Sequence, residues 1–111
     1  MSGIHIGFVK IPVTDVARSA AFFRDVVGLA EDFVVPEYGW AQMGSGSIPL
    51  CLYVPGRGGG GGAPGAETGI QFRVADARAV HARLVAAGAE PGELDVGDDG
   101  TVAFPFTDPD G

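Results

Sequence analysis

The sequence has one cysteine, two histidines, and only seven lysines and arginines against fourteen aspartates and glutamates. The single thiol, Cys51, excludes an internal disulfide and a four-cysteine metal site, and it is compatible with a reducing compartment. The resulting net charge of −7 argues against nucleic acid or an anionic membrane surface as the partner. A cationic or neutral ligand is favoured instead.

Long hydrophobic runs are also lacking. No apolar stretch approaches the roughly 20 residues that a membrane-spanning helix needs, and the N-terminus lacks the charged-then-apolar pattern of a signal peptide. We therefore expect a cytoplasmic protein. The 111 residues suffice for one domain. Two halves of about 50 residues each would be marginal alone, so we expect them to pack together.

The chain contains an internal repeat. Residues 8–28, FVKIPVTDVARSAAFFRDVVG, return in a shorter and altered form as residues 69–88, GIQFRVADARAVHARLVAAG. Each copy passes from an alternating apolar segment through Val-x-Asp into a helical pattern that ends at glycine, and Asp15 and Asp76 are placed to cap the two helices. The repeat predicts one supersecondary unit used twice.

The periodicity of the first unit predicts a strand, a helix and three short strands, at residues 8–13, 16–27, 31–35, 39–43 and 49–54. The second unit is predicted to form a strand, a helix and two further strands, at residues 69–74, 77–87, 93–96 and 101–106. Between the units, residues 56–67 contain five consecutive glycines without a Gly-Lys-Ser/Thr phosphate motif. We interpret this segment as a flexible linker.

Two segments are specific enough to suggest a family. Residues 13–25, VTDVARSAAFFRD, begin the first helix, and residues 106–111, FTDPDG, form a terminal turn. Together with the repeat they resemble the glyoxalase/bleomycin resistance protein/dioxygenase superfamily, which has the vicinal oxygen chelate fold. The resemblance implies a single α+β domain over residues 1–111, in which two tandem βαβββ modules, about 7–55 and 68–111, form a curved mixed sheet around a concave cavity. It also implies a homodimer and a last strand that would lie beyond Gly111.

The resemblance further implies four places for the ligands of a divalent metal ion. Three of them fall on Phe8, Cys51 and Gly69, and the fourth lies beyond Gly111. Phenylalanine and glycine have no donor side chain, and one thiolate cannot replace three hard ligands. We therefore expect no metal, no other cofactor and no catalytic residue, and we interpret Cys51 as an inert buried thiol.

Strand alternation places aromatic and polar side chains on the sheet face that the helices leave open. The candidate ligand-binding residues are Phe8, Lys10, Phe33, Tyr38, Trp40, Gln42, Cys51, Tyr53, Gln71, Arg73 and Phe104. Such a lining suits a large, flat or extended organic molecule. Core packing is an equally good interpretation of Tyr38 and Trp40, as is solvent exposure for Lys10 and Arg73. Ordinary core packing is expected for Phe22, Phe23, Phe72 and Phe106.

The first functional hypothesis is metal-independent sequestration of a natural-product antibiotic, bleomycin-like or polyaromatic, without chemical change. The resemblance and the aromatic lining favour it, and the acidic balance would attract a cationic drug. The alternative is an enzyme of the same superfamily, either a metal-dependent lyase, isomerase or dioxygenase, or a metal-free catalyst that uses Lys10, Tyr53 or Arg73. A regulatory or scaffolding module is the third class.

Overall fold

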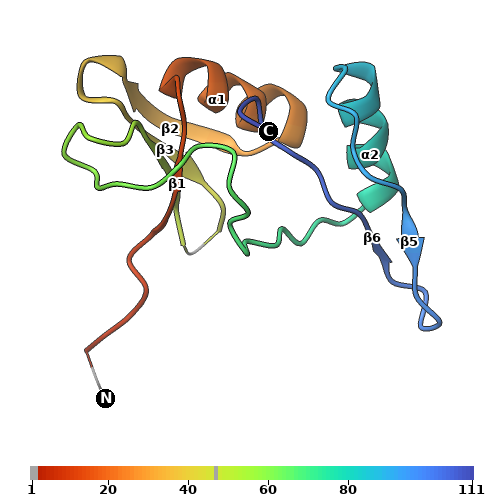
Figure 1. Ribbon diagram of the computed structural model, residues 1–111. Helices are drawn as coiled ribbons and strands as arrows, with labels where there is room; N and C mark the ends of the chain where they lie inside the picture. Colours follow the sequence, from red (N-terminus) through yellow and green to blue (C-terminus); the bar gives the residue numbers. More distant parts are fainter. Residues whose placement is uncertain (1–2, 47) are drawn as a thin grey trace.

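The computed structural model describes residues 3–46 and 48–111. The first half of the chain forms a complete βαβββ unit (Figure 1). Its elements are strand β1 (Val9–Pro12), helix α1 (Val16–Phe22), the π-helix η1 (Phe23–Val27), strand β2 (Ala30–Val35), the 3-10 helix η2 (Pro36–Tyr38), strand β3 (Trp40–Gly44) and strand β4 (Leu50–Tyr53). The pattern predicted for this half is confirmed, with strand boundaries shifted by one residue at most.

The four strands form one mixed sheet in the order β1-β4-β3-β2. Strand β1 runs parallel to β4, and β3 pairs antiparallel with both β4 and β2. Lys10 pairs with Cys51, and Cys51 pairs with Gln42, so these three residues lie in one row across the sheet. Such pairing fixes which side chains share a face, because successive residues in a strand point to opposite sides.

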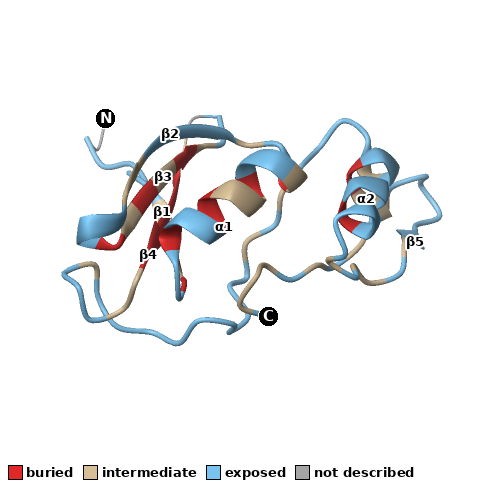
Figure 2. Ribbon diagram, turned by 90° about the horizontal axis from the view of Figure 1, so that it is seen from above, coloured by how far each residue is buried: buried red, intermediate tan, exposed pale blue. Residues whose placement is uncertain are grey.

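One face of the sheet packs against α1, which lies across it (Figure 2). The helix begins at Asp15, whose carboxylate accepts hydrogen bonds from the backbone N–H groups of Ala17 and Arg18 at 3.0 and 3.1 Å. The buried core between helix and sheet consists of Ile11, Val13, Val16, Ala20, Phe23, Val27, Ala41, Met43, Leu50 and Leu52. The opposite face of the sheet is therefore left for other contacts.

The second half contains helix α2 (Ala77–Ala86) and a two-stranded sheet of β5 (Asp95–Val96) and β6 (Val102–Ala103). The helix is confirmed, and Asp76 caps it as expected, because its carboxylate accepts from the backbone N–H of Ala79 at 3.1 Å. No helix in residues 3–46 and 48–111 has the length and apolar character that crossing a membrane requires.

The strands of the second half differ from the prediction. Residues 69–74 form no strand, although Ile70 and Phe72 pack against the core of the first unit as their alternation suggests. Alternation of apolar residues indicates that one side of a segment is buried. A strand also needs a hydrogen-bonding neighbour, and this segment pairs with no strand among the described residues. The strand predicted at residues 101–106 is reduced to β6, which ends before Pro105, a residue that cannot donate to a ladder.

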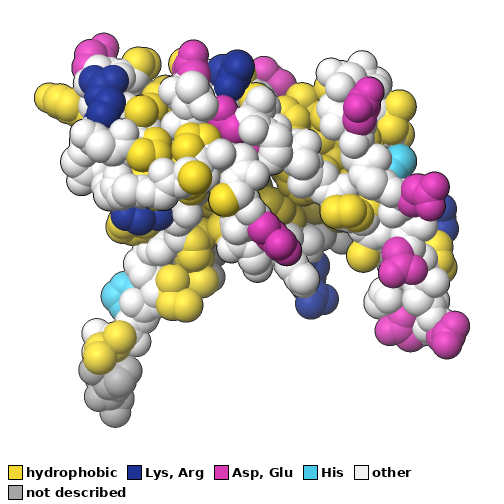
Figure 3. All heavy atoms as spheres, in the orientation of Figure 1, with side chains coloured by type: hydrophobic (Ala, Val, Ile, Leu, Met, Phe, Trp, Pro, Cys, Tyr) yellow, Lys and Arg dark blue, Asp and Glu magenta, His cyan; other side chains and the backbone are white. Residues whose placement is uncertain are grey.

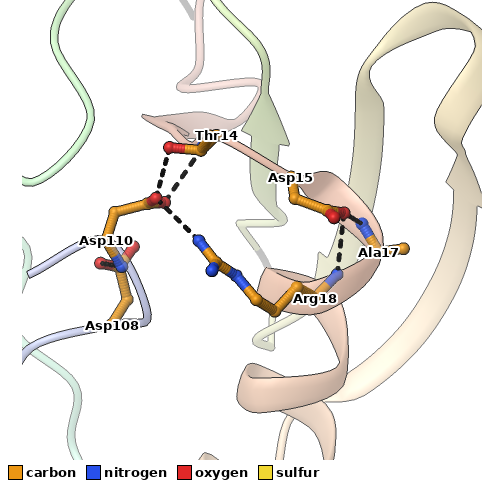
Figure 4. A network of polar contacts seen from close by, with 6 residues as sticks. All are labelled: Thr14, Asp15, Ala17, Arg18, Asp108 and Asp110. Atoms are coloured by element: carbon orange, nitrogen blue, oxygen red, sulfur yellow. Dashed lines mark hydrogen bonds and ion pairs between the residues drawn. The ribbon is translucent and has the colours of Figure 1, made fainter.

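A polar network joins the end of the chain to the turn between β1 and α1 (Figure 4). The Asp110 carboxylate accepts from the backbone N–H of Thr14 at 3.1 Å, from the Thr14 hydroxyl, and from Nη2 of Arg18 at 3.1 Å. The Asp110 side chain is only 5% exposed. The two segments on which the family resemblance rests are therefore in direct contact.

Two further contacts join the halves. Nη2 of Arg83, on α2, donates to the backbone carbonyl of Val27 at 3.0 Å. An aromatic cluster, with ring centroids 5.4 to 6.3 Å apart between neighbours, contains Phe22, Phe23, Phe72 and Phe106. The core packing predicted for these four rings is confirmed. The combination of helices and a mixed sheet also confirms the predicted α+β fold class.

Candidate functional site

The face opposite α1 gathers most of the predicted ligand-binding residues. One row of paired residues crosses the strands β1, β4, β3 and β2 in that order, and it consists of Lys10, Cys51, Gln42 and Phe33. The next row along the same face contains Pro12, Tyr53, Trp40 and Val35. Phe8 joins this face as well, because its ring meets that of Trp40 edge-on with centroids 5.7 Å apart.

A slot of about 450 Å³ opens on one side of this face. It is lined by Phe33, Val35, Tyr38, Trp40, Arg57, Gly58 and Gly59, and we call it the aromatic slot. Its volume lies within the range of about 300–1,000 Å³ that is typical of small-molecule sites. Phe33 and Tyr38 remain 44% and 72% exposed, so these rings are accessible to a ligand.

Residues 56–62, which we call the glycine strap, lie over the part of this face that Tyr53, Trp40 and Pro12 form. Nζ of Lys10 donates to the backbone carbonyl of Gly59, and the Tyr53 hydroxyl donates to that of Gly61. The strap is also closed on itself, because the N–H of Gly56 donates to the carbonyl of Gly60 at 3.0 Å. Residues that we interpreted as part of a linker therefore lie over the sheet and form one wall of the slot.

Glycine is required in the strap because its backbone lies so close to the sheet. A Cβ on Gly59 would come within 3.0 Å of Tyr53 Cβ and 3.2 Å of Trp40 Cζ3. A Cβ on Gly62, where φ is +110°, would come within 2.8 Å of the Tyr53 hydroxyl. The five-glycine run permits this close approach of the backbone to the sheet.

Removing the Tyr53 hydroxyl tests whether it holds the strap in place. Tyr53→Phe deletes one hydrogen bond to a backbone carbonyl and is expected to cost about 1 kcal/mol of local stability. Hydrogen exchange followed by mass spectrometry should then show roughly fivefold faster exchange of the strap amides. Tyr38→Phe is the matched control, since Tyr38 is exposed and its hydroxyl bonds to none of the described residues. Equal exchange in both variants would contradict this role of Tyr53.

A short polar chain runs along the same face beside the slot. Nε2 of Gln42 donates to the Asp32 carboxylate at 3.0 Å, and the Cys51 thiol lies 4.0 Å from Oε1 of Gln42. Burial raises the pKa of the Cys51 thiol, and the negative charge of Asp32 raises it further. The thiol is therefore protonated at neutral pH and is a poor nucleophile.

The residues at the places implied for a metal ion do not fit one. Phe8 presents a phenyl ring, Cys51 a single thiol, and Gly69 no side chain at all. Divalent ions in proteins are held by carboxylate, imidazole, thiolate or carbonyl donors. Within residues 3–46 and 48–111, no three His, Cys, Asp or Glu side chains come together in a group that could hold a metal ion.

Three predicted site residues lie elsewhere. Gln71 and Arg73 line a separate cavity of about 410 Å³ together with Val9 and Leu50, whose side chains belong to the α1 side of the sheet. Phe104 packs edge-on against the ring of His81, with centroids 4.8 Å apart, in the second half. The expectation that these three share one face with Lys10 and Trp40 is wrong, because the second repeat does not form a matching sheet.

Sequence reasoning also missed part of the slot. Val35 shares the parity of Phe33 and could have been included from alternation alone. Arg57, Gly58 and Gly59 belong to the strap, and composition gave no signal of where its backbone would lie.

Part of the acidic excess of the chain lies away from the slot. Exposed carboxylates surround β5 and the turn that follows it, at Glu90, Glu93, Asp95, Asp98 and Asp99. Figure 3 shows acidic side chains gathered at this end of the second half. The slot itself has no acidic residue in its lining, so the net charge of the chain does not describe the charge that a ligand meets there.

The family model of the Glyoxalase/Bleomycin resistance protein/Dioxygenase superfamily matches residues 5–111, while no curated protein matches the chain. Among solved structures, the chain is similar to a member of that superfamily from Sphaerobacter thermophilus DSM 20745, with a TM-score of 0.82 and 21% identity over 100% of this chain and 94% of that one. It is similar to an antibiotic-binding protein from Streptomyces sp. CB03234, with a TM-score of 0.79 and 25% identity over 100% and 92%. A lactoylglutathione lyase from Agrobacterium tumefaciens gives a TM-score of 0.71 and 20% identity over 100% and 90%. The chain therefore belongs to the glyoxalase/bleomycin resistance protein/dioxygenase superfamily.

Proposed function

We propose that this protein binds a hydrophobic, aromatic natural-product antibiotic and sequesters it without chemical change, so that resistance follows from removal of the free drug. The observation that carries the proposal is the aromatic slot. Its walls present the rings of Phe33, Tyr38 and Trp40, which can stack against a flat ligand while burial of apolar surface supplies affinity.

The chemistry of the face supports binding rather than catalysis. Two groups on this face could catalyse a reaction without a metal, Lys10 and Tyr53. Both donate hydrogen bonds to backbone carbonyls of the strap. The Cys51 thiol is buried and protonated, and no histidine lies in the slot. Similarity to an antibiotic-binding protein at 25% identity points the same way. Similarity to the lyase concerns the fold alone.

The experiment is a fluorescence titration, because Trp40 is the sole tryptophan and lines the slot. Bleomycin and the tetracyclic aromatic daunorubicin would be titrated in turn, and each ligand recovered afterwards for mass spectrometry. We expect saturable quenching at one ligand per chain, with the mass of the recovered ligand unchanged. A changed mass would identify an enzyme. Lack of saturable quenching with bleomycin, with daunorubicin and with a neutral polyaromatic compound would contradict sequestration and favour a regulatory or scaffolding role.

A homodimer remains a proposal that follows from the family. Phe8, on the open face, is 48% exposed, and Ile6, two residues before it, is 62% exposed; a second copy of the chain would cover these apolar side chains. Sedimentation at micromolar concentration should then give twice the mass of the chain, whereas a stable monomer would exclude a site shared between copies.

A further inference from the structure

The aromatic slot contains one charged side chain among the residues that line it, and the charge is positive. Arg57 extends from the glycine strap into the lining, beside Tyr38 and Trp40. No aspartate or glutamate contributes to that lining. The slot is therefore an apolar, aromatic site with a single cation.

Arg57 is held in place by the turn that it crosses. Its Nη2 donates to the backbone carbonyl of Glu37, and its Cδ would lie 3.4 Å from a Cβ on Gly39, so the stem of the arginine runs alongside that turn. Gly39 is itself fixed, since its N–H donates to the carbonyl of Pro36 at 3.1 Å and its carbonyl accepts from Val54 at 2.9 Å. Arg57 is thus oriented before any ligand arrives.

The guanidinium retains free donors. Of its five N–H groups, one is satisfied by Glu37, and no other hydrogen bond or ion pair joins it to residues 3–46 and 48–111. Arginine donors in a planar fork match the two oxygens of a carboxylate, and such charge-assisted bonds are about twice as strong as neutral ones. An anionic oxygen at the slot would therefore meet an oriented partner.

We infer that the ligand of the slot is a planar aromatic acid, with its rings against Trp40 and Phe33 and its carboxylate or phenolate oxygen on Arg57. This inference rests on the proposed function and narrows its ligand class. It also reverses the preference for a cation that the net charge of −7 suggested. That net charge acts at long range on the rate of encounter, whereas the local partner decides which bound ligand is retained.

Three probes that share one ring system test the inference: anthraquinone-2-carboxylate, the neutral anthraquinone-2-carboxamide and the cationic 2-(aminomethyl)anthraquinone. Each would be titrated against the fluorescence of Trp40 at pH 7.5 and low salt. The carboxylate is expected to bind about tenfold more tightly than the amide, and the amine most weakly. Raising the salt concentration should weaken only the carboxylate.

Substitution of Arg57 assigns this preference to one residue. Arg57→Gln should lower the affinity for the carboxylate about tenfold and change that for the amide by less than about twofold. Arg57→Lys, which keeps the charge but loses the fork, should fall between Arg57→Gln and the wild type. Arg78→Gln is the matched control, because Arg78 is exposed on α2 and the change in net charge is the same. It should leave all three affinities unchanged.

The outcomes separate this inference from the proposed function. Binding of all three probes with equal affinity would overturn the inference and leave sequestration intact. An anion preference that survives in Arg57→Gln would likewise overturn the role of Arg57. Failure of every probe to bind would overturn the inference, while the titrations with bleomycin and daunorubicin would still decide sequestration.

Discussion

Replacing Asp110 by alanine is expected to lower the free energy of unfolding by about 2–3 kcal/mol. The carboxylate is nearly buried and accepts from the Thr14 N–H, the Thr14 hydroxyl and Arg18. Its removal breaks these three hydrogen bonds and releases the end of the chain from the first unit. Because Arg18 is 52% exposed, the ion pair itself should supply the smaller share. Urea unfolding followed by circular dichroism measures the loss.

Asp99→Ala is the matched control for Asp110→Ala. Asp99 also accepts from a backbone N–H and a threonine hydroxyl, those of Thr101 at 3.0 and 2.7 Å, but in an exposed turn. Water can replace those bonds, so this variant should unfold close to the wild type. Arg18→Ala should cost less than Asp110→Ala. If Asp110→Ala were as mild as Asp99→Ala, the network in Figure 4 would not be what joins the two segments.

The first half of the fold could be predicted because its signals are local. Alternation assigned Ile11 and Val13 to the helix side and Lys10 to the other, and the sheet register confirms this. Helix starts were predictable for the same reason, since a capping aspartate acts within its own turn. The second repeat has the same local pattern at residues 69–74, yet within the part of the chain that the structure describes no strand pairs with it. Pairing depends on the whole chain, and a single segment does not encode it.

The candidate site, too, could be predicted only in the part that depends on local signals. Strand parity correctly grouped Lys10, Trp40, Gln42, Cys51 and Tyr53, because pairing in the first sheet transfers parity from strand to strand. The glycine strap could not be placed, since a glycine-rich composition is typical both of a mobile linker and of a backbone that approaches other atoms closely. A mobile linker and a closely packed backbone differ in whether another surface lies against the glycines, and that surface forms only when the whole chain folds. Arg57 was missed together with the strap that carries it.

The aromatic slot itself depends most on Trp40. Trp40→Leu keeps an apolar side chain on β3 but removes the ring on which a flat ligand would stack. We expect it to weaken binding of anthraquinone-2-carboxamide at least about 30-fold, which corresponds to roughly 2 kcal/mol, because central aromatic residues dominate such sites. This neutral probe does not depend on the charge of Arg57. Calorimetry is the measurement, since the variant has no tryptophan left to report binding.

Phe104→Leu is the control for Trp40→Leu, because it removes a half-buried ring that packs against His81 and lies outside the lining of the slot. Affinity for the same probe should change by less than about twofold in this variant. The pair also separates two arrangements of the site. If the two repeats enclosed one common cavity, as their sequence similarity suggests, both substitutions would weaken binding alike. A loss confined to Trp40→Leu would place the ligand on the sheet of the first repeat, under the strap.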